Sequence, residues 1–594
     1  MNRNDYFPVV LIFVAAVAVT SPAFADNDVF EPVIVTATRM QLPADESLAS
    51  IIVIDREEIE RSLAADVAEL LRFHAGLELG RNGGPGQTTS LFIRGTESNH
   101  ALVMLDGVEI NPGTIGGAAL QNISPRLIQR IEVVKGPRSS LYGSEAIGGV
   151  VNIITRKTDG LEVRAGAGRY TTREASLSAG MMGTIGDLSA SLSRLRSDGF
   201  PTRTADGAPD RGYDNQSLGL NASTTLGRSE VSLRHWESSG NTEYLDFFLD
   251  PVDQDYQNRA TALAIAGQPA GNWSTTVTFS RITDDITQQQ GPDFARTDRN
   301  SMDWQNDVQL AERHRVVAGI YVSREKTQAS SFGTGFDERT GVDAYYVEDY
   351  IDFEPGQLLL AARFTDHDTF ADNTTWNVEY GRRLANGWRL TAAAGTAFRA
   401  PDATDRFGFG GNPELLSEES QNIEFGIDRR FGSYHWLRFS LFRNEIEDLI
   451  EYFDGGNLNV AEARVTGLDA GYRWHNTAWR INVNAIFQDP EDRQAHMQLA
   501  RRAKRSLTVN ATRQFADYSV GLDVLATSAR RDSPFSETIN AGYVLANLSA
   551  QWQLSAQWAL QGRIENLLDR DYETAASFRS PGRGFYLSLG YRLQ

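Results

Sequence analysis

The stretch Trp479-Arg480-Ile481-Asn482-Val483-Asn484-Ala485-Ile486-Phe487 decides the fold of this 594-residue chain. Positions 479, 481, 483, 485 and 487 carry apolar side chains, and Arg480, Asn482 and Asn484 alternate with them. Because side chains two positions apart point to the same side of a strand, this stretch predicts a β-strand with one apolar and one polar face.

The same alternation continues along residues 158–594 in segments of roughly 10 residues, with turns that are alternately short and long. It recurs in Leu188–Ser193, in the segment that begins at Trp388 after the hairpin turn Asn386-Gly387, and in Phe585–Leu593. A soluble β-sandwich alternates too, but it rarely exceeds ~250 residues as one domain, and no linker divides this region. The pattern therefore predicts an all-β transmembrane barrel.

In such a barrel the apolar face contacts lipid and the polar face lines the lumen. Trp388, Trp479 and Trp558 begin apolar faces, as residues of an interfacial aromatic girdle do. At roughly 20 residues for each strand and its turn, the region holds about 22 antiparallel strands, although the sequence does not separate this number from about 18.

Composition excludes several other classes of protein. The chain has no cysteine, so disulfide scaffolds and thiol sites are out. Its net charge of -20 argues against a nucleic-acid partner. A mean hydropathy of -0.35 argues against a bundle of membrane-spanning helices. A membrane β-barrel remains, since its alternating strands average to polar.

The N-terminal 157 residues differ from the barrel region. Phe7–Val19 is an apolar run that is short for a membrane span, and it leads to the small-x-small site Ala23-Phe24-Ala25. We interpret residues 1–25 as a secretory signal peptide, the alternative being a buried terminal helix. Residues 26–40 form an N-terminal segment, residues 41–157 a globular domain and residues 158–594 the barrel.

The globular domain mixes strands, one helix and glycine turns. Strands are predicted at 51–54, 102–105, 131–134 and 150–154, and a helix capped by Asp55 at 56–73. A barrel of about 22 strands would leak unless a folded domain filled it, so we expect this α+β domain to be a plug in the lumen. A separate periplasmic domain is the alternative.

Several motifs, in this order, resemble those of TonB-dependent outer-membrane receptors. Residues 31–39 (EPVIVTATR) are similar to the family's Ton box, and Ser90–Gly95, Met104–Val108 and Arg130–Thr155 are similar to its plug signature. The resemblance continues in the barrel at Phe398–Pro401, Gly411–Leu415 and Asn566–Tyr572. It covers essentially the whole mature chain.

Within that family the chain most resembles the cobalamin (vitamin B12) receptors. It is short for the family, Asn82–Gln87 is similar to their apical plug loop, and Leu499–Lys504 is similar to one of their barrel segments. The resemblance implies uptake of cobalamin or a related corrinoid across the outer membrane. A ferric-siderophore receptor of the same architecture is the alternative, and a passive pore or adhesin would need no Ton box.

The resemblance implies TonB as the energy-coupling partner, because the outer membrane has no ATP and the chain has no phosphate-binding glycine loop. An extended, β-branched segment can add a strand to a partner's sheet edge. Taken alone, the segment could also be an ordinary N-terminal strand of the plug. The expected TonB-binding residues are Glu31, Pro32, Val33, Ile34, Val35, Thr36 and Ala37.

The glycine-rich turns at 81–87 and 111–118 are expected to be outward-facing loops of the plug, where glycine lets the backbone approach a bulky ligand. Simple tight turns are the alternative, and Arg501 could be a solvated lumen arginine. At Glu97 the cobalamin receptors have an uncharged amide, which suggests a different corrinoid or orientation. By resemblance the substrate-binding residues are Thr88, Ser90, Glu97, Ile115, Gly116 and Arg501.

Aspartates cluster in two neighbouring loops of the barrel, at a spacing that suits Ca²⁺. The first loop carries Pro201 and Arg211 where the cobalamin receptors' pattern would have acids. In so acidic a chain a merely solvated loop is the alternative. No other cofactor is expected. The candidate calcium ligands are Asp210, Asp214, Asp246 and Asp253.

Nothing in the sequence predicts catalysis. The eight histidines are scattered without a His-x-x-x-His pair, and no Gly-x-Ser-x-Gly elbow occurs.

Charges of the plug, such as Arg94, Arg138 and Glu145, are expected to form ion pairs with the lumen wall and to hold the plug reversibly. The chain is therefore predicted to be a monomeric transporter in outer-membrane lipid, with no enzyme activity.

Overall fold

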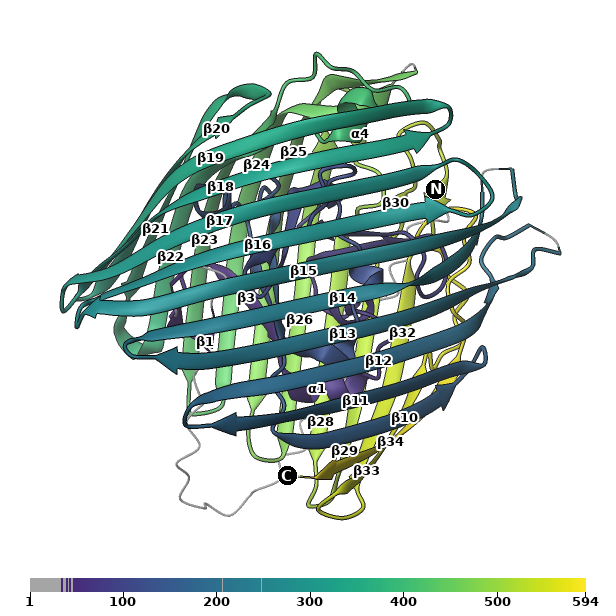
Figure 1. Ribbon diagram of the computed structural model, residues 1–594, viewed down its shortest axis with the longest axis horizontal. Helices are drawn as coiled ribbons and strands as arrows, with labels where there is room; N and C mark the ends of the chain where they lie inside the picture. The colour runs from purple at the N-terminus through teal and green to yellow at the C-terminus, as the bar shows by residue number, and fades with distance from the viewer. Residues whose placement is uncertain are drawn as a thin grey trace.

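The computed structural model describes residues 34–35, 39–40, 42–43, 46–205, 207–246, 248–453 and 455–593. These residues form a closed β-barrel with a small α+β domain inside it (Figure 1). The predicted signal peptide, residues 1–25, lies outside the described residues. Within the described ranges, no helix combines the length and the apolar character that crossing a membrane requires.

The barrel is built, within the described residues, from 22 long strands, each antiparallel to its neighbours, and β34 closes it against β10. This confirms the predicted fold and selects 22 over 18. The strands are β10 (Gly160–Gly168), β11 (Thr172–Gly183), β12 (Gly186–Pro201), β13 (Asp210–Leu226), β14 (Ser229–Leu245), β15 (Pro251–Ala270), β16 (Trp273–Gln288), β17 (Phe294–Ala311), β18 (His314–Ser331), β19 (Thr334–Phe353), β20 (Gly356–His367), β21 (Phe370–Arg383), β22 (Trp388–Arg399), β23 (Glu418–Phe431), β24 (His435–Phe453), β25 (Gly456–His475), β26 (Trp479–Asp492), β28 (Arg505–Gln514), β29 (Tyr518–Thr527), β32 (Tyr543–Gln553), β33 (Trp558–Glu565) and β34 (Gly584–Leu593).

The long connections, such as residues 400–417 and 566–583, all leave one end of the barrel, so the two ends differ. One end, which we call the short-turn rim, carries tight hairpins such as the one at Asn386 (φ 61°) and Gly387 (φ 74°). Both residues are left-handed, as an Asn-Gly hairpin turn requires. The other end, the long-loop rim, carries the long connections, with helix α4 (Ala403–Phe407) and the short strands β27 (Met497–Gln498), β30 (Arg530–Arg531) and β31 (Ile539–Asn540).

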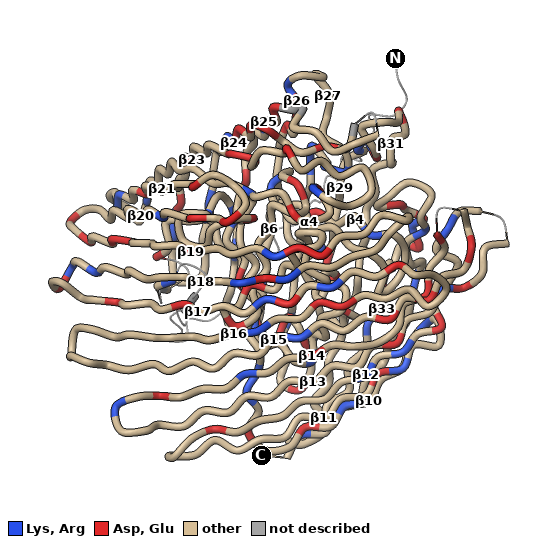
Figure 2. The backbone as a smooth tube through the Cα atoms, turned by 45° about the horizontal axis from the view of Figure 1, so that its top comes forward, with Lys and Arg blue, Asp and Glu red and all other residues tan. Residues whose placement is uncertain are grey.

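The two faces of each strand separate as predicted. Leu188 and Leu192 are 56% and 52% exposed, whereas the alternating Ser189 and Ser191 are 4% and 5% exposed and face the interior. Figure 2 shows long uncharged stretches in strands such as β13, β15 and β16, with charges toward their long-loop ends. Trp388, Trp479 and Trp558 each start a strand at the short-turn rim, where a girdle would meet the membrane interface.

The interior domain contains a five-stranded sheet in the order β3-β8-β9-β6-β7 and a separate β4–β5 hairpin. The four predicted strands are confirmed as β3, β6, β8 and β9. The elements are β3 (Ser50–Ile54), α1 (Arg56–Ser62), α2 (Val67–Arg72), β4 (Leu77–Arg81), β5 (Thr89–Ile93), β6 (Ala101–Leu105), β7 (Val108–Glu109), β8 (Ile128–Lys135), α3 (Ser139–Tyr142) and β9 (Gly149–Thr155), with single 3₁₀ turns at Ser98–His100, Leu120–Asn122 and Pro125–Leu127.

The predicted helix over 56–73 is wrong as one element, because it divides into α1 and α2. Asp55 caps α1 as expected, accepting a hydrogen bond from the Glu58 N–H at 2.8 Å. Leu63 then adopts a left-handed conformation (φ 46°), and Asp66 caps the second helix through the Glu69 N–H. The apolar period continues across the break because both helices bury their apolar faces in the same core.

The domain fills the barrel lumen, as the purple ribbon inside the strands of Figure 1 shows. Its apolar core includes barrel residues such as Trp236, Ala260 and Ile282, so plug and wall share one hydrophobic cluster. This confirms the plug and excludes a separate domain. The boundary predicted after residue 157 falls between β9 and β10.

Candidate functional site

The first glycine-rich turn of the plug lies at the tip of the β4–β5 hairpin and is packed against the barrel wall. A Cβ added at Gly86 (φ 75°) would lie 2.1 Å from the ring of Tyr213, so only glycine fits there. Gln87 donates a hydrogen bond from Nε2 to the Glu243 carbonyl at 2.7 Å. The loop is thus held in place, and Thr88 beside it is exposed.

The second glycine-rich turn, residues 111–118, is stabilised by its own hydrogen bonds. Asn111 is buried; its side chain accepts from the Val103 N–H at 2.8 Å and donates to the Gly116 carbonyl at 2.8 Å. Gly116 is left-handed (φ 67°), and Ile115 is 48% exposed at the tip. This arrangement presents one apolar side chain on a rigid loop.

The structure brings one predicted barrel contact to the plug. A Cβ added at Gly80 of β4 would lie 3.6 Å from Cδ of Arg501 and 3.9 Å from Cβ of Ser90. Arg501 also lies 3.6 Å from Asp532 on the hairpin of β30 and β31. Thr88, Ser90 and Arg501 therefore gather on one side of the plug.

Ile115 and Gly116 form a second group. A Cβ added at Gly116 would lie 3.1 Å from Asp402 and 3.2 Å from Asn99, so the Ile115–Gly116 tip lies beside the loop that connects β22 and β23. Five of the six predicted contacts thus fall into two separate groups rather than one cluster.

Glu97 has a structural partner that the sequence analysis missed. Its carboxylate pairs with Arg502, whose Nε donates to the Thr96 carbonyl at 3.3 Å and whose guanidinium lies 4.8 Å from the centre of the Phe92 ring. The acid therefore fits this chain because a buried arginine neutralises it. The adjacent arginines at 501 and 502 were visible in the sequence, but only the fold shows that Arg501 lies beside Gly80 and that Arg502 pairs with Glu97.

Three of the four aspartates proposed as calcium ligands have other partners in the structure. Asp214 pairs with Arg194 at 2.7 Å, Asp246 accepts the N–H groups of residues 248 and 250 at 2.8 Å, and Asp253 accepts from Gln290 at 2.8 Å. No group of three or more acidic or histidine side chains suited to a metal occurs among the residues with described positions. Calcium at Asp210, Asp214, Asp246 and Asp253 stays a prediction that requires these loops to rearrange.

Buried ion pairs join the plug to the wall, as predicted for Arg94 and Arg138. Arg94 pairs with Glu424 at 2.8 Å and with Asp469 at 3.2 Å. Burial acts to lower the pKa of Arg94, but these two carboxylates outweigh it and hold the pKa above its ordinary value. Lys135 shares Asp469 at 2.8 Å. Three plug–wall contacts therefore depend on one cluster of charges.

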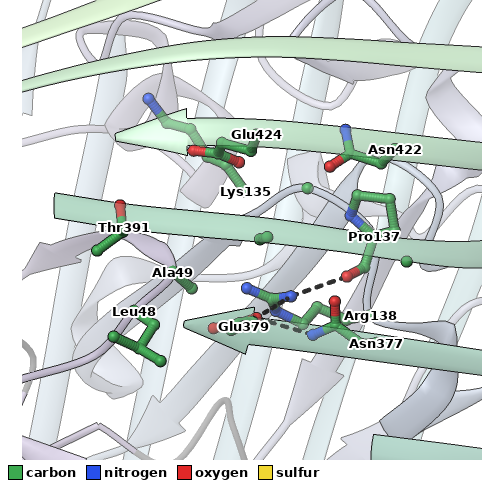
Figure 3. A pocket seen from close by; sticks show the side chains of 13 residues that line it. Leu48, Ala49, Lys135, Pro137, Arg138, Asn377, Glu379, Thr391, Asn422 and Glu424 are labelled. Atoms are coloured by element: carbon green, nitrogen blue, oxygen red, sulfur yellow. Dashed lines mark hydrogen bonds and ion pairs between the residues drawn. The ribbon is translucent and has the colours of Figure 1, made fainter. Parts of the chain in front are cut away.

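A narrow cleft beside this cluster contains the second predicted pair. Arg138 of the plug contacts Glu379 of β21 at 2.8 Å, and Asn377 donates to the same carboxylate at 2.8 Å, as the dashed lines in Figure 3 show. Lys135 and Glu424 lie in the same view. The wall thus offers acids where the plug offers bases.

The prediction for Glu145 is wrong. This side chain forms no ion pair among the described residues, and its Oε2 is buried without a hydrogen-bond partner. Burial, together with the neighbouring Glu109, raises the pKa of Glu145 well above its ordinary value. The sequence showed an acid in a charged run, but its neighbours come from distant segments.

The N-terminal segment enters the barrel next to a strong anchor. Ile34–Val35 (β1) pairs with Leu42–Pro43 (β2) in a two-stranded sheet of its own, so this segment is not part of the five-stranded plug sheet. The other predicted TonB-binding residues, Glu31, Pro32, Val33, Thr36 and Ala37, lie outside the described residues.

Arg39 supplies the anchor. Its Nη1 contacts Asp303 of β17 at 2.7 Å and the hydroxyl of Tyr346 at 2.8 Å, and its backbone N–H donates to the hydroxyl of Tyr142 at 3.1 Å. The guanidinium also lies 4.0 Å from the centre of the Tyr346 ring. Arg39 therefore fixes the end of the N-terminal segment to both plug and wall.

Replacing Arg39 with alanine should release this segment. Charge-assisted hydrogen bonds are worth ~1.5–3 kcal/mol, so a thiol introduced by Thr36→Cys should react about tenfold faster with a polar maleimide in R39A. The chain has no other cysteine, so the introduced thiol is the only site that the maleimide labels. Asp303→Asn is the matched control, because it removes only the ion pair. Equal labelling rates for T36C alone, with R39A and with D303N would show that Arg39 does not hold this segment.

Comparison with known proteins matches both domains. Residues 162–567 match the family model "TonB dependent receptor-like, beta-barrel", and residues 43–150 match the "TonB-dependent Receptor Plug Domain". Vitamin B12 transporter BtuB of Photobacterium profundum is 28% identical over 603 residues, covering 98% of this chain and 99% of that protein.

Solved structures show the same fold at low identity. The siderophore receptor PiuA of Acinetobacter baumannii has a TM-score of 0.78 at 16% identity, covering 93% of this chain and 98% of that one. The ferric-catecholate import receptor Fiu of E. coli K12 has a TM-score of 0.79 at 14% identity, covering 94% and 99%.

Proposed function

Since this chain belongs to the TonB-dependent receptor family, we propose that the cargo it carries is cobalamin (vitamin B12) or a related corrinoid. Membership makes it an outer-membrane transporter and not an enzyme. The long-loop rim is then extracellular and the short-turn rim periplasmic.

The observation that carries the corrinoid proposal is the similarity to a vitamin B12 transporter along 98% of this chain. The siderophore receptors share its fold at 16% identity or less, so they give weaker support for a siderophore as the cargo of this chain. The geometry is consistent with a large ligand. Thr88, Ser90 and Arg501 lie on one side, and Ile115 and Gly116, which lie beside the loop between β22 and β23, on the other.

We propose that residues 31–37 bind TonB by strand addition, which needs main-chain hydrogen bonds more than particular side chains. The anchor at Arg39 supports this role, because a pull on the segment acts directly on Asp303, Tyr346 and Tyr142. Tyr142 lies in α3 of the plug, so force reaches the plug through a short path.

Equilibrium titration of the detergent-solubilised protein tests the cargo. Cyanocobalamin should bind with a Kd in the nanomolar range, about -12 kcal/mol, and a panel of ferric siderophores should not compete. Arg501→Ala should weaken the binding by about tenfold, as loss of one hydrogen bond from a charged group does. Siderophore binding with no cobalamin binding would assign the chain to the alternative cargo.

The same titration with and without a chelator tests calcium. Cobalamin binding that weakens when calcium is removed would support the four aspartates as ligands that assemble only when the loops order. Binding that does not change would discard the metal and leave the cargo proposal intact. Asp214→Asn tests the metal site separately from the cargo site. In the structure Asp214 pairs with Arg194 and not with another acid, so a change in calcium dependence in this variant would point to Asp214 as a ligand.

A further inference from the structure

A cavity of about 170 Å³ lies between the plug and strands β17–β20, away from the Arg501 side of the plug. The plug contributes Glu109, Tyr142 and Glu145 to its lining. Its outer end is lined by the β20–β21 turn and by α4 with the residues that precede it. The cavity therefore connects the extracellular rim with the helix that holds Arg39.

Several polar groups that line this cavity lack partners. Oε2 of Glu145, Oγ1 of Thr327 and Nε of Arg406 are buried without a hydrogen bond. Arg363 is 2% exposed, and its hydrogen bonds within the described residues go to neutral groups, Thr365 at 3.1 Å and the Leu141 carbonyl at 3.3 Å. Buried polar groups are normally satisfied, so these three atoms that border one cavity are available to a ligand.

The charge of the lining selects the kind of ligand. Its acidic and basic side chains nearly balance, and Arg299 is already engaged by both Glu109 and Glu325. An anion would meet the carboxylates and a cation the guanidinium groups, so a neutral polar group is favoured. Because burial and Glu109 raise the pKa of Glu145, its carboxyl can donate as well as accept.

We infer that this cavity is a second subsite for the cargo and binds carboxamide side arms of a neutral ligand. A primary amide offers two donors and an acceptor, which matches donors from arginine and acceptors from Glu145 and Thr327. The inference rests on the proposed function, since corrinoids carry such amides. The sites adjoin: Gly113 lines the cavity, and Asp402 lines it while lying beside Gly116.

Two variants at Glu145 test the subsite through affinity. Glu145→Leu removes the hydrogen-bonding group and should weaken cyanocobalamin binding about tenfold. Glu145→Gln keeps a donor and an acceptor and should stay within about threefold of the unmodified chain. Both replacements are unbranched at Cβ, so the left-handed backbone at this position (φ 71°) is strained equally in each.

A labelling measurement tests occupancy without changing Glu145. The chain has no cysteine, so Thr340→Cys places a single thiol on the cavity wall, and Gln289→Cys places one on a neighbouring extracellular loop as the control. Saturating cyanocobalamin should slow labelling of T340C by a small methanethiosulfonate about tenfold and leave Q289C unchanged.

The outcomes separate the subsite from the function. Tight binding of cobalamin, combined with an E145L affinity within twofold of the unmodified chain or with T340C labelled at an unchanged rate, overturns the subsite and leaves the cargo assignment standing. No cobalamin binding by the unmodified chain overturns the proposed function and the subsite with it.

Discussion

Replacing Val35 with proline is expected to abolish energy-driven uptake while the affinity for external cargo stays unchanged. Strand addition depends on backbone hydrogen bonds, and proline removes one N–H and fixes φ. Val35 lies opposite Leu42 in the short β1–β2 pair, outside the plug sheet, so the fold of the plug should not change. We expect uptake of labelled cyanocobalamin to fall by about 100-fold, because leaving a main-chain hydrogen-bonding group unpaired costs ~1–3 kcal/mol and the fixed φ of proline adds to this cost.

Val35→Ala is the matched control, because it shortens the side chain and keeps the N–H. It should retain most of the uptake if main-chain pairing carries the affinity for TonB. Surface binding of the cargo should be equal in both variants and in the unmodified chain. A parallel loss of binding and uptake in V35P would mean that the substitution damages the plug, and uptake that survives it would remove residues 31–37 from the coupling role.

Periodicity made the barrel predictable from sequence. Strand alternation is a local property with period two, so Leu188, Ser189 and Phe487 could be assigned to lipid or lumen before any partner strand was known. The Asn386-Gly387 turn was predictable for the same reason, since both residues tolerate a positive φ. The number of strands was not, because closure depends on the whole sheet.

Features that depend on contacts between distant segments could not be predicted. The helix breaks at Leu63, and each of the two helices has its own acidic N-cap, Asp55 for α1 and Asp66 for α2. The apolar period runs through the break, so the sequence pattern did not indicate it. The pairing of Glu97 with Arg502 joins segments about 400 positions apart. The unpaired Glu145 is a further example, since the acids and arginines around it come from the plug, β17, β18 and β22.

The cluster around Arg94 is where we expect the largest loss of stability. Arg94→Met should destabilise docking of the plug by about 3–5 kcal/mol, because it leaves Glu424 buried without its partner. The barrel should survive, since β23–β25 keep their own ladder of hydrogen bonds. Amide hydrogen exchange should therefore rise in the plug strands and not in the barrel, and cells should admit large hydrophilic antibiotics.

Two further variants decide whether the buried charge is the cause. Glu424→Gln added to Arg94→Met removes the uncompensated carboxylate and should recover a large part of the loss, as replacement of a whole buried pair often does. Lys504→Met breaks a pair with Asp489 at 2.6 Å whose side chains are 49% and 61% exposed, and it should cost less than about 1 kcal/mol. If R94M and K504M lowered plug protection equally, the plug would be held by its shared apolar core with Trp236 and Ile282, and charge would contribute only to its orientation.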